Sequence, residues 1–292
     1  MINVRPSKQK VMQHSIARDF TGGWNVVDNQ KNLKSVYAPV LTNMMRRNDG
    51  TLGVRYGTEL FKDLTSTLGS ARIVELVYFQ EYIIVFASDG KIYSVTGGGT
   101  VATIWDSTIA GALGVAAWSA HQFVSTAVYG STMIVCNGID KPLDIDMTRS
   151  PNKVIYLGDP ASGGANTFVP IGKYVETTDR YAIISGNATY PSRVYISSQD
   201  GPGVWKIESG AAPAPNSAVY RDLTKSSPTG ANNITGLKRY KNNVLVLFDN
   251  LTLVGVLGIL DGSGNHQPDF TQYVEAHGSV AARTVSSTGD DV

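Results

Sequence analysis

The sequence predicts an all-β protein, a β-propeller-like series of repeated antiparallel blades preceded by an irregular N-terminal arm. The first observation is composition: 30 glycines, 14 tyrosines and a charged share of 17% in 292 residues favour strands and turns over helices. The second is the hairpin signal at Asp89-Gly90 and again at Asn137-Gly138, next to apolar runs. The third is recurrence, because similar segments return at intervals of about 50 residues, near the upper end of known blade periods.

The N-terminal arm, residues 1–62, is basic. It holds ten Lys and Arg against four Asp and Glu, a formal charge of +6, whereas residues 63–292 hold fifteen against twenty, a charge of −5. The two parts account for the net +1 of the chain. Such asymmetry predicts that the arm meets an acidic protein surface or nucleic acid, or that it folds back onto its own acidic body. Halves of opposite charge can also pair head-to-tail between subunits.

The first repeat begins at Ala71 with "ARIVELVYFQEYIIVFASDGKIYSVTGGGT". It predicts a leading strand, an apolar strand over Tyr82–Ala87, a turn, and a third strand over Lys91–Thr96. "TGGGT" closes the segment and is a turn, because it lacks the lysine and the following helix of a phosphate-binding loop.

Three later segments repeat this order of leading strand, short turn, apolar strand and further strand. The apolar strand of the second runs over Thr132–Cys136. Equivalent starts at Ile73, Phe123, Tyr181 and Ile234 define units that cannot bury both faces alone, and radial stacking of such units is a β-propeller domain over residues 63–292. A β-sandwich with regular hairpins is the alternative fold.

The last segment, "VEAHGSVAARTVSSTGDDV", reads as the start of another unit. It predicts a strand over residues 279–286 with no partner strand after it. An open strand edge is a feature that proteins usually cover. The chain is therefore expected to be one part of a longer propeller, or to receive the missing strands from a distant segment.

Residues that could carry chemistry are few. The four histidines do not share metal-ligand spacing, and Cys136 lies inside an apolar strand, which indicates a structural thiol. The loop Asp261–Asp269 lacks the glycine and the glutamate of a calcium site, and Asp140, Asp144 and Asp146 are expected in a solvated bend. No stretch approaches a membrane span. The sequence thus predicts a protein without catalytic residues, metal or cofactor.

The opening stretch, with "GGWNVVD", "APVLTNM" and "NDGTLGVRYGTELF", resembles a known family. It is similar to the N-terminal signature of the tail nozzle (tail tubular protein B-like) and packaged-DNA-stabilisation hub proteins of short-tailed phages. The matching positions are Gly22, Gly23, Asn25, Leu41, Asn43, Gly50, Arg55, Gly57 and Thr58. Two later pieces, "SRVYISSQDGPGVWKIESG" and "HGSVAARTV", resemble blade segments of the same family.

The resemblance implies a structural virion protein of the phage tail, made in the host cytoplasm. Its copies would form a ring of six below the portal and adaptor proteins, and this ring extends and closes the DNA channel. The implied partners are other copies, the portal and adaptor, tail fibre or spike proteins, and passing genomic DNA without sequence specificity. No membrane is involved.

The residues expected at subunit and adaptor contacts are basic or aromatic groups of the arm. They are Arg5, Lys8, Lys10, Trp24, Arg46, Arg47, Arg55 and Tyr56. Aromatic anchors and arginines contribute strongly to interfaces, although Trp24 could instead plug the core against the first blade.

Two other classes of function stay open. A propeller could be a glycan- or receptor-binding module, with exposed Trp105, Trp118 or Trp205 stacking on sugar rings. It could also be a hydrolase whose acids meet at the propeller axis.

Reversing the charge of Arg46 and Arg47 to glutamate should block ring assembly. The basic clusters lack the interleaved aromatics that grip single-stranded nucleic acid, and a cationic wall would retain DNA that has to slide out. We therefore expect these arginines to face protein carboxylates. Assembly is measured by particle incorporation and DNA affinity by gel shift. Tight DNA binding by the unaltered chain that the reversed variant loses would contradict the prediction.

Overall fold

The computed structural model describes two parts of the chain, which divides into compact units of residues 1–62 and 63–292. In the first unit it describes residues 60–62 and the backbone of four short strands, β1 to β4. In the second it describes residues 63–158, 169–199, 201–205, 218–223, 233–249, 251–262, 266–275 and 279, with only the backbone of 271–275.

The four short strands of the first unit pair two by two. Strand β1 (Gly23–Trp24) pairs in parallel with β2 (Tyr37–Ala38). Strand β3 (Met44–Arg46) pairs antiparallel with β4 (Leu52–Val54).

The second unit contains four antiparallel sheets of four strands, each a simple meander in chain order. We call these sheets blades 1 to 4. Blade 1 consists of β5 (Ile73–Phe79), β6 (Tyr82–Ala87), β7 (Ile92–Thr96) and β8 (Val101–Trp105). Blade 2 consists of β9 (Ser125–Tyr129), β10 (Thr132–Cys136), β11 (Leu143–Ile145) and β12 (Val154–Tyr156).

Blades 3 and 4 repeat the arrangement. Blade 3 consists of β13 (Tyr174–Thr177), β14 (Ala182–Ser185), β15 (Arg193–Ile196) and β16 (Val219–Asp222). Blade 4 consists of β17 (Gly236–Tyr240), β18 (Asn243–Leu247), β19 (Leu251–Val256) and β20 (Asp269–Glu275).

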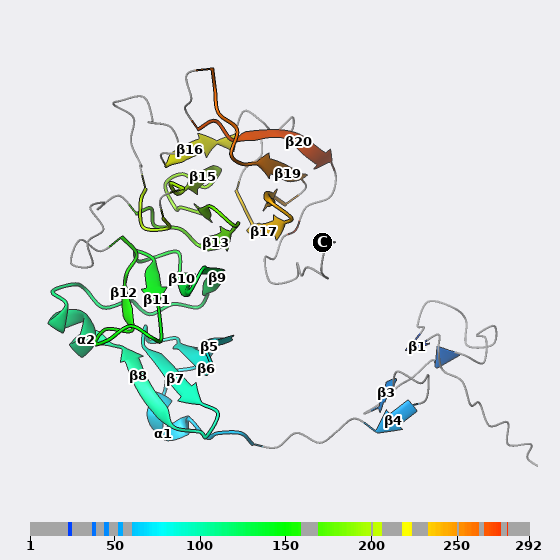
Figure 1. The fold of residues 1–292 in the computed structure, drawn as a ribbon. Helices are drawn as coiled ribbons and strands as arrows, with labels where there is room; N and C mark the ends of the chain where they lie inside the picture. The colour runs from blue at the N-terminus through cyan, green and yellow to red at the C-terminus, as the bar shows by residue number, and fades with distance from the viewer. Residues whose placement is uncertain are drawn as a thin grey trace, which may run out of the picture. The chain divides into compact units, whose positions relative to one another are not determined.

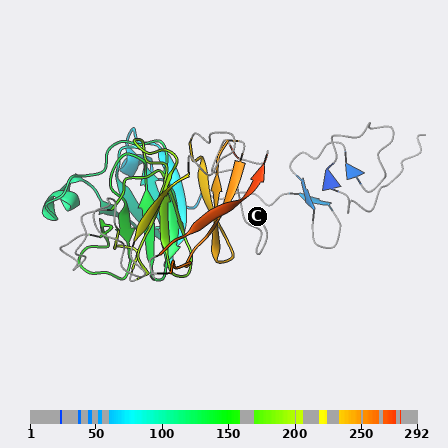
Figure 2. The same cartoon turned by 90° about the horizontal axis from the view of Figure 1, so that it is seen from above.

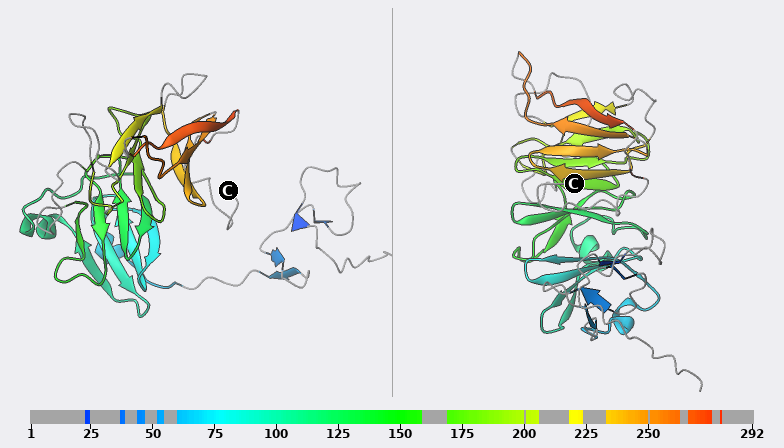
Figure 3. Two further views of the ribbon diagram at one scale, coloured as in Figure 1. Left: turned by 45° about the horizontal axis from the view of Figure 1, so that its top comes forward. Right: turned by 90° about the vertical axis from the view of Figure 1, so that its right-hand side faces the viewer.

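The blades follow one another along an arc that does not close into a ring (Figures 1 and 3). Figure 1 shows the first strand of each blade, β5, β9, β13 and β17, on the concave side. From above, the blades stand beside one another with their strands nearly upright (Figure 2). This is the layout of a β-propeller, and the predicted all-β, propeller-like fold is confirmed.

Tight hairpins join the first and second strands of the blades, and the predicted turns at Asp89-Gly90 and Asn137-Gly138 join the second and third strands of blades 1 and 2. Gln80 and Glu81, between β5 and β6, both have positive φ, and so does Lys241 between β17 and β18. Positive φ in a two-residue turn matches the twist of the flanking strands. The strands predicted at Tyr82–Ala87 and Thr132–Cys136 have these bounds in the structure.

One repeat boundary was wrong. We placed the start of the third unit at Tyr181, but blade 3 begins seven residues earlier, at Tyr174. Arg180 and Tyr181 belong to the connection between β13 and β14, because Thr178 N donates to Tyr181 O at 2.9 Å and closes that turn. The apolar run "YAIIS" is therefore the second strand of its blade.

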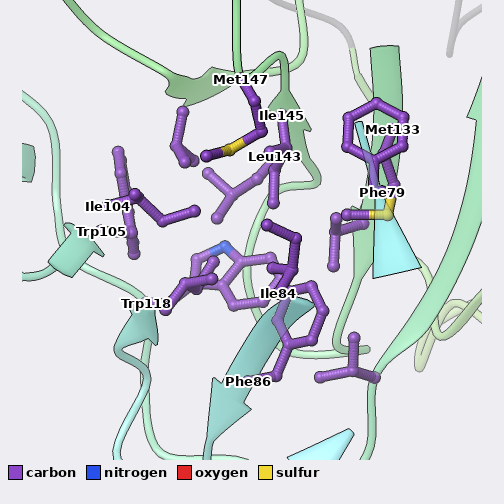
Figure 4. Packing of buried hydrophobic residues seen from close by; sticks show 14 of the residues in the cluster. Phe79, Ile84, Phe86, Ile104, Trp105, Trp118, Met133, Leu143, Ile145 and Met147 are labelled. Atoms are coloured by element: carbon purple, nitrogen blue, oxygen red, sulfur yellow. The ribbon is translucent and has the colours of Figure 1, made fainter. Parts of the chain in front are cut away.

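Apolar side chains fill the space between successive blades. Between blades 1 and 2 the core includes Ile84, Phe86, Trp105, Met133 and Leu143, none of which is exposed (Figure 4). Equivalent cores lie between blades 2 and 3 and between blades 3 and 4. A strand such as β10 alternates between them, because Met133 and Val135 face blade 1 whereas Ile134 and Cys136 face blade 3.

Side-chain hydrogen bonds also join neighbouring blades. Gln80, in the β5–β6 turn, donates to Ser131 O at 2.6 Å and accepts from Met147 N at 2.7 Å. Thr177 Oγ1 donates to Val128 O at 2.6 Å, which ties β13 to β9. These bonds fix the register of one blade against the next.

Two short helices accompany blade 1. Helix α1 (Thr65–Leu68) precedes it, and its last residue, Leu68, packs together with the N-cap residue Leu64 on the face of blade 1 that points away from blade 2. Helix α2 (Ser107–Ala112) follows β8, and the Asp106 carboxylate caps it by accepting from Ile109 N at 2.8 Å.

Changing Gly255 to alanine should destabilise the protein by about 1–3 kcal/mol, the usual cost of overpacking a core. A Cβ at this position in β19 would collide with the Phe270 ring and with Val244. Gly97 is the matched control, because a Cβ there meets nothing within 4 Å. Denaturant unfolding of both variants measures the difference, and equal stability would contradict this packing.

Candidate binding surfaces

The predicted contact residues of the arm lie outside the described residues. Arg5, Lys8, Lys10, Arg47, Arg55 and Tyr56 belong to this group. Trp24 and Arg46 fall on the backbone of β1 and β3, and nothing is described of their side chains. The strand predicted over residues 279–286 also lies outside the described residues, apart from Ser279.

The tryptophans expected to stack on sugars are buried, so this part of the glycan-binding alternative was wrong. Trp105 is 0% exposed, Trp118 4% and Trp205 2%. Trp118 Nε1 donates to Lys141 O at 3.0 Å, and Trp205 Nε1 donates to Pro202 O at 2.5 Å. The rings fill the cores between and beside blades, which their large apolar area favours.

The inner strands of the blades line a hollow of about 170 Å³. Glu75 of β5, Glu176 of β13 and Lys238 of β17 lie around it, together with Ser125 at the start of β9. The fold thus brings two carboxylates from different blades to the concave side, which the sequence did not reveal because they lie about a hundred residues apart. Three polar groups of mixed charge give this side a hydrophilic lining.

A larger pocket, of about 370 Å³, opens between blades 3 and 4. Turns at one end of the two sheets form it. The lining residues are Thr178, Asp179, Arg180, Tyr181, Gln199, Asn242, Leu257 and Gly258. Most of these side chains offer hydrogen-bond donors or acceptors, so the pocket is suited to a polar ligand.

Packing between the two blades holds the wall of this pocket in place. The Tyr181 ring stacks on buried His266 with centroids 4.8 Å apart and an interplanar angle of 7°. Gln199 Nε2 donates to Tyr181 Oη at 2.5 Å. Burial raises the pKa of Tyr181, since it disfavours the phenolate. Across the rim, Arg239 of blade 4 pairs with Asp179 of blade 3 at 2.6 Å.

The three aspartates near the β10–β11 turn have protein partners. Asp140 accepts hydrogen bonds from Ser119 N and Asn137 Nδ2, both at 2.8 Å. Asp144 pairs with Arg149 at 2.8 Å; burial raises the pKa of Asp144 against the opposing effect of the arginine.

Cys136 is fully buried, as expected for a structural thiol, and burial raises its pKa. In the part of the chain that the structure describes, no three His, Cys, Asp or Glu residues form a group that could hold a metal ion. Across the same ranges no helix is long and apolar enough to cross a membrane.

An exposed apolar strip lies on the first strand of blade 1. Ile73, Leu76 and Tyr78 of β5 are 43%, 52% and 74% exposed. Their partners on β6, Ala87, Val85 and Ile83, share the same face of the sheet and belong to the cluster under α1. The helix therefore shields the β6 and β7 side of this face, whereas the β5 side stays open.

No protein-family model matches the sequence, and no curated protein matches it. Among solved structures, Kluyvelomyces marxianus Hsv2 is 6% identical with a TM-score of 0.39, covering 68% of this chain and 60% of that one. PorZ, a surface component of the type-IX secretion system of Porphyromonas gingivalis, is 14% identical with a TM-score of 0.39, covering 70% of this chain and 23% of that one. The computationally designed Ika4 protein is 10% identical with a TM-score of 0.39, covering 74% of this chain and 100% of that one.

This chain thus spans less than two thirds of the length of Hsv2 and of PorZ. These TM-scores are too low to bear on function. The class of protein, a β-propeller-like module, rests on the strand pairing itself.

Proposed function

We propose that this chain is a structural subunit of a short-tailed phage tail, part of the nozzle or hub ring below the portal and adaptor. The proposal rests on the resemblance of the segment from Gly22 to Thr58 to the signature of that family. A subunit of this kind works through protein contacts. The structural observation that supports the proposal is the exposed apolar strip on the inner strand β5, formed by Ile73, Leu76 and Tyr78.

That strip suits an assembly role because large apolar groups on a regular strand seldom stay uncovered. A glycan-binding domain that works as a monomer would not require an exposed apolar strip on this strand. A polar and partly acidic concave side, with Glu75 and Glu176, is compatible with DNA passage, since carboxylates do not neutralise phosphates and so do not retain the strand.

The tail role predicts that the protein is a component of the mature particle. Immunogold labelling of purified particles, from the phage whose genome encodes the chain, should place the label at the tail rather than on the head. Antibody absorbed with the purified chain is the control. Absence of the protein from the particles by mass spectrometry would refute the tail role.

A second candidate function is supported by the pocket between blades 3 and 4. Asp179, Arg180, Gln199 and Asn242 place polar groups around a volume of about 370 Å³, which suits a sugar or a polar segment of a receptor. Such a module would recognise its ligand by hydrogen bonds, because the three tryptophans are buried.

A glycan array distinguishes the two candidates. A receptor-binding module should bind defined glycans, with a loss of at least tenfold in affinity for Asn242→Ala and no loss for Lys141→Ala, which lies away from the pocket. A nozzle subunit should bind none of them. Binding that both variants retain would exclude this pocket as the site.

A further inference from the structure

The pocket between blades 3 and 4 is framed by two turns that are tied to each other. One is the β13–β14 turn, residues 178–181, and the other is the β17–β18 turn, which contains Lys241 and Asn242. Arg239 joins them, because its Nε donates to Lys241 O at 2.9 Å and its Nη2 pairs with Asp179 at 2.6 Å. The two sides of the pocket are therefore held in place before any ligand binds, which lowers the cost of ordering the site.

The charges of the pocket do not cancel. Its described lining contains one cation, Arg180, and one anion, Asp179. The Asp179 carboxylate is already paired with Arg239, whereas none of the salt bridges among the described residues involves Arg180. The backbone that carries Arg180 is fixed, since Tyr129 Oη donates to Arg180 O at 3.1 Å. The described part of the pocket thus presents one positive charge without a counter-charge.

Tyr181 supplies a second hydrogen-bond donor beside this charge. Its ring stacks on His266, and its oxygen accepts from Gln199 Nε2 at 2.5 Å. A phenol that accepts one bond can still donate its own hydrogen. Burial raises the pKa of Tyr181 against the opposing effects of the Gln199 bond and the Arg180 charge, so the hydrogen is retained at neutral pH. A phenol and a guanidinium side by side are both satisfied by an anion, which only accepts.

The number of charges limits the kind of anion. One guanidinium balances one carboxylate and can bind it through two parallel hydrogen bonds. A phosphate monoester carries a charge of about −1.5 to −2 at neutral pH, which a single unpaired arginine does not balance. The other polar lining groups are the amides of Asn242 and Gln199 and the hydroxyl of Thr178. These groups both donate and accept, as sugar hydroxyls do.

We propose that this pocket binds a sugar acid. Arg180 and Tyr181 hold the carboxylate, and Asn242 and Gln199 contact the hydroxyl groups of the ring. The volume of about 370 Å³ lies near the lower end of the range for small-molecule pockets, which suits a small ligand. This inference rests on the second candidate function, recognition of a polar ligand between blades 3 and 4, and it names the class of that ligand. It does not depend on the tail role.

Matched sugars test the requirement for a carboxylate. The full chain is titrated by NMR with glucuronate, galacturonate and mannuronate, with the methyl ester of each, and with the 6-phosphates of glucose, galactose and mannose. At least one of the three acids should bind at least tenfold more tightly than its methyl ester, because esterification removes the charge and keeps the ring. It should also bind more tightly than the corresponding 6-phosphate.

Substitutions assign the contact to individual residues. Arg180→Gln should weaken binding of the sugar acid at least tenfold and leave binding of the ester unchanged, and Arg180→Lys should recover part of the loss. Tyr181→Phe, which keeps the ring that stacks on His266, should weaken binding about threefold to tenfold. Lys141→Gln is the matched control, because it removes the same charge from an exposed side chain between β10 and β11, and it should change nothing.

Four results would overturn the inference. Equal binding of acid and ester would show that the charge is not recognised; loss of that binding in Asn242→Ala would then leave the second candidate function standing. Tighter binding of a 6-phosphate would assign a different anion. Equal losses in Arg180→Gln and Lys141→Gln would indicate general electrostatic attraction. Absence of binding by every sugar would refute the inference, and a glycan array without any binding would refute the second candidate function as well.

Discussion

The structure depends on one constraint: each four-stranded sheet is apolar on both faces and must be covered on both. A strand such as β10, with Met133 and Val135 on one side and Ile134 and Cys136 on the other, cannot lie at a surface without exposing apolar area. Stacking sheets side by side covers both faces at once. The inner sheets of the arc are covered on both faces in this way, whereas among the described residues no blade precedes blade 1 and none follows blade 4.

That constraint explains why the tryptophans and several turn residues have structural roles instead of binding roles. Trp105 and Trp118 lie in the core between blades 1 and 2, and Trp205 in the core between blades 2 and 3. Turn residues are also used to join sheets: Gln80 reaches blade 2, and Asp179 reaches Arg239 of blade 4. Among the described residues, surfaces open to binding include the concave side, the pocket between blades 3 and 4, and the β5 strip.

Local sequence signals predicted hairpins well and the limits of the repeats less well. The strands at Tyr82–Ala87 and Thr132–Cys136 were predictable because apolar alternation and turn residues are local properties. The third blade was placed too late because β13 is short and polar at its end, so Tyr181 looked like a leading strand. Burial of the tryptophans was missed, since burial depends on which sheets are neighbours.

The sequence by itself determined the all-β class, the repeated unit, the main hairpins and the buried thiol, because propensity, turn chemistry and period act over a few residues. Only the tertiary structure decided which side chains share a surface. Glu75 and Glu176 meet at one hollow although 101 positions separate them, and Leu76 is exposed where Val175 is covered. The physical reason is that exposure of a strand residue is set by the sheet beside it, and that sheet comes from a distant part of the chain or from another molecule.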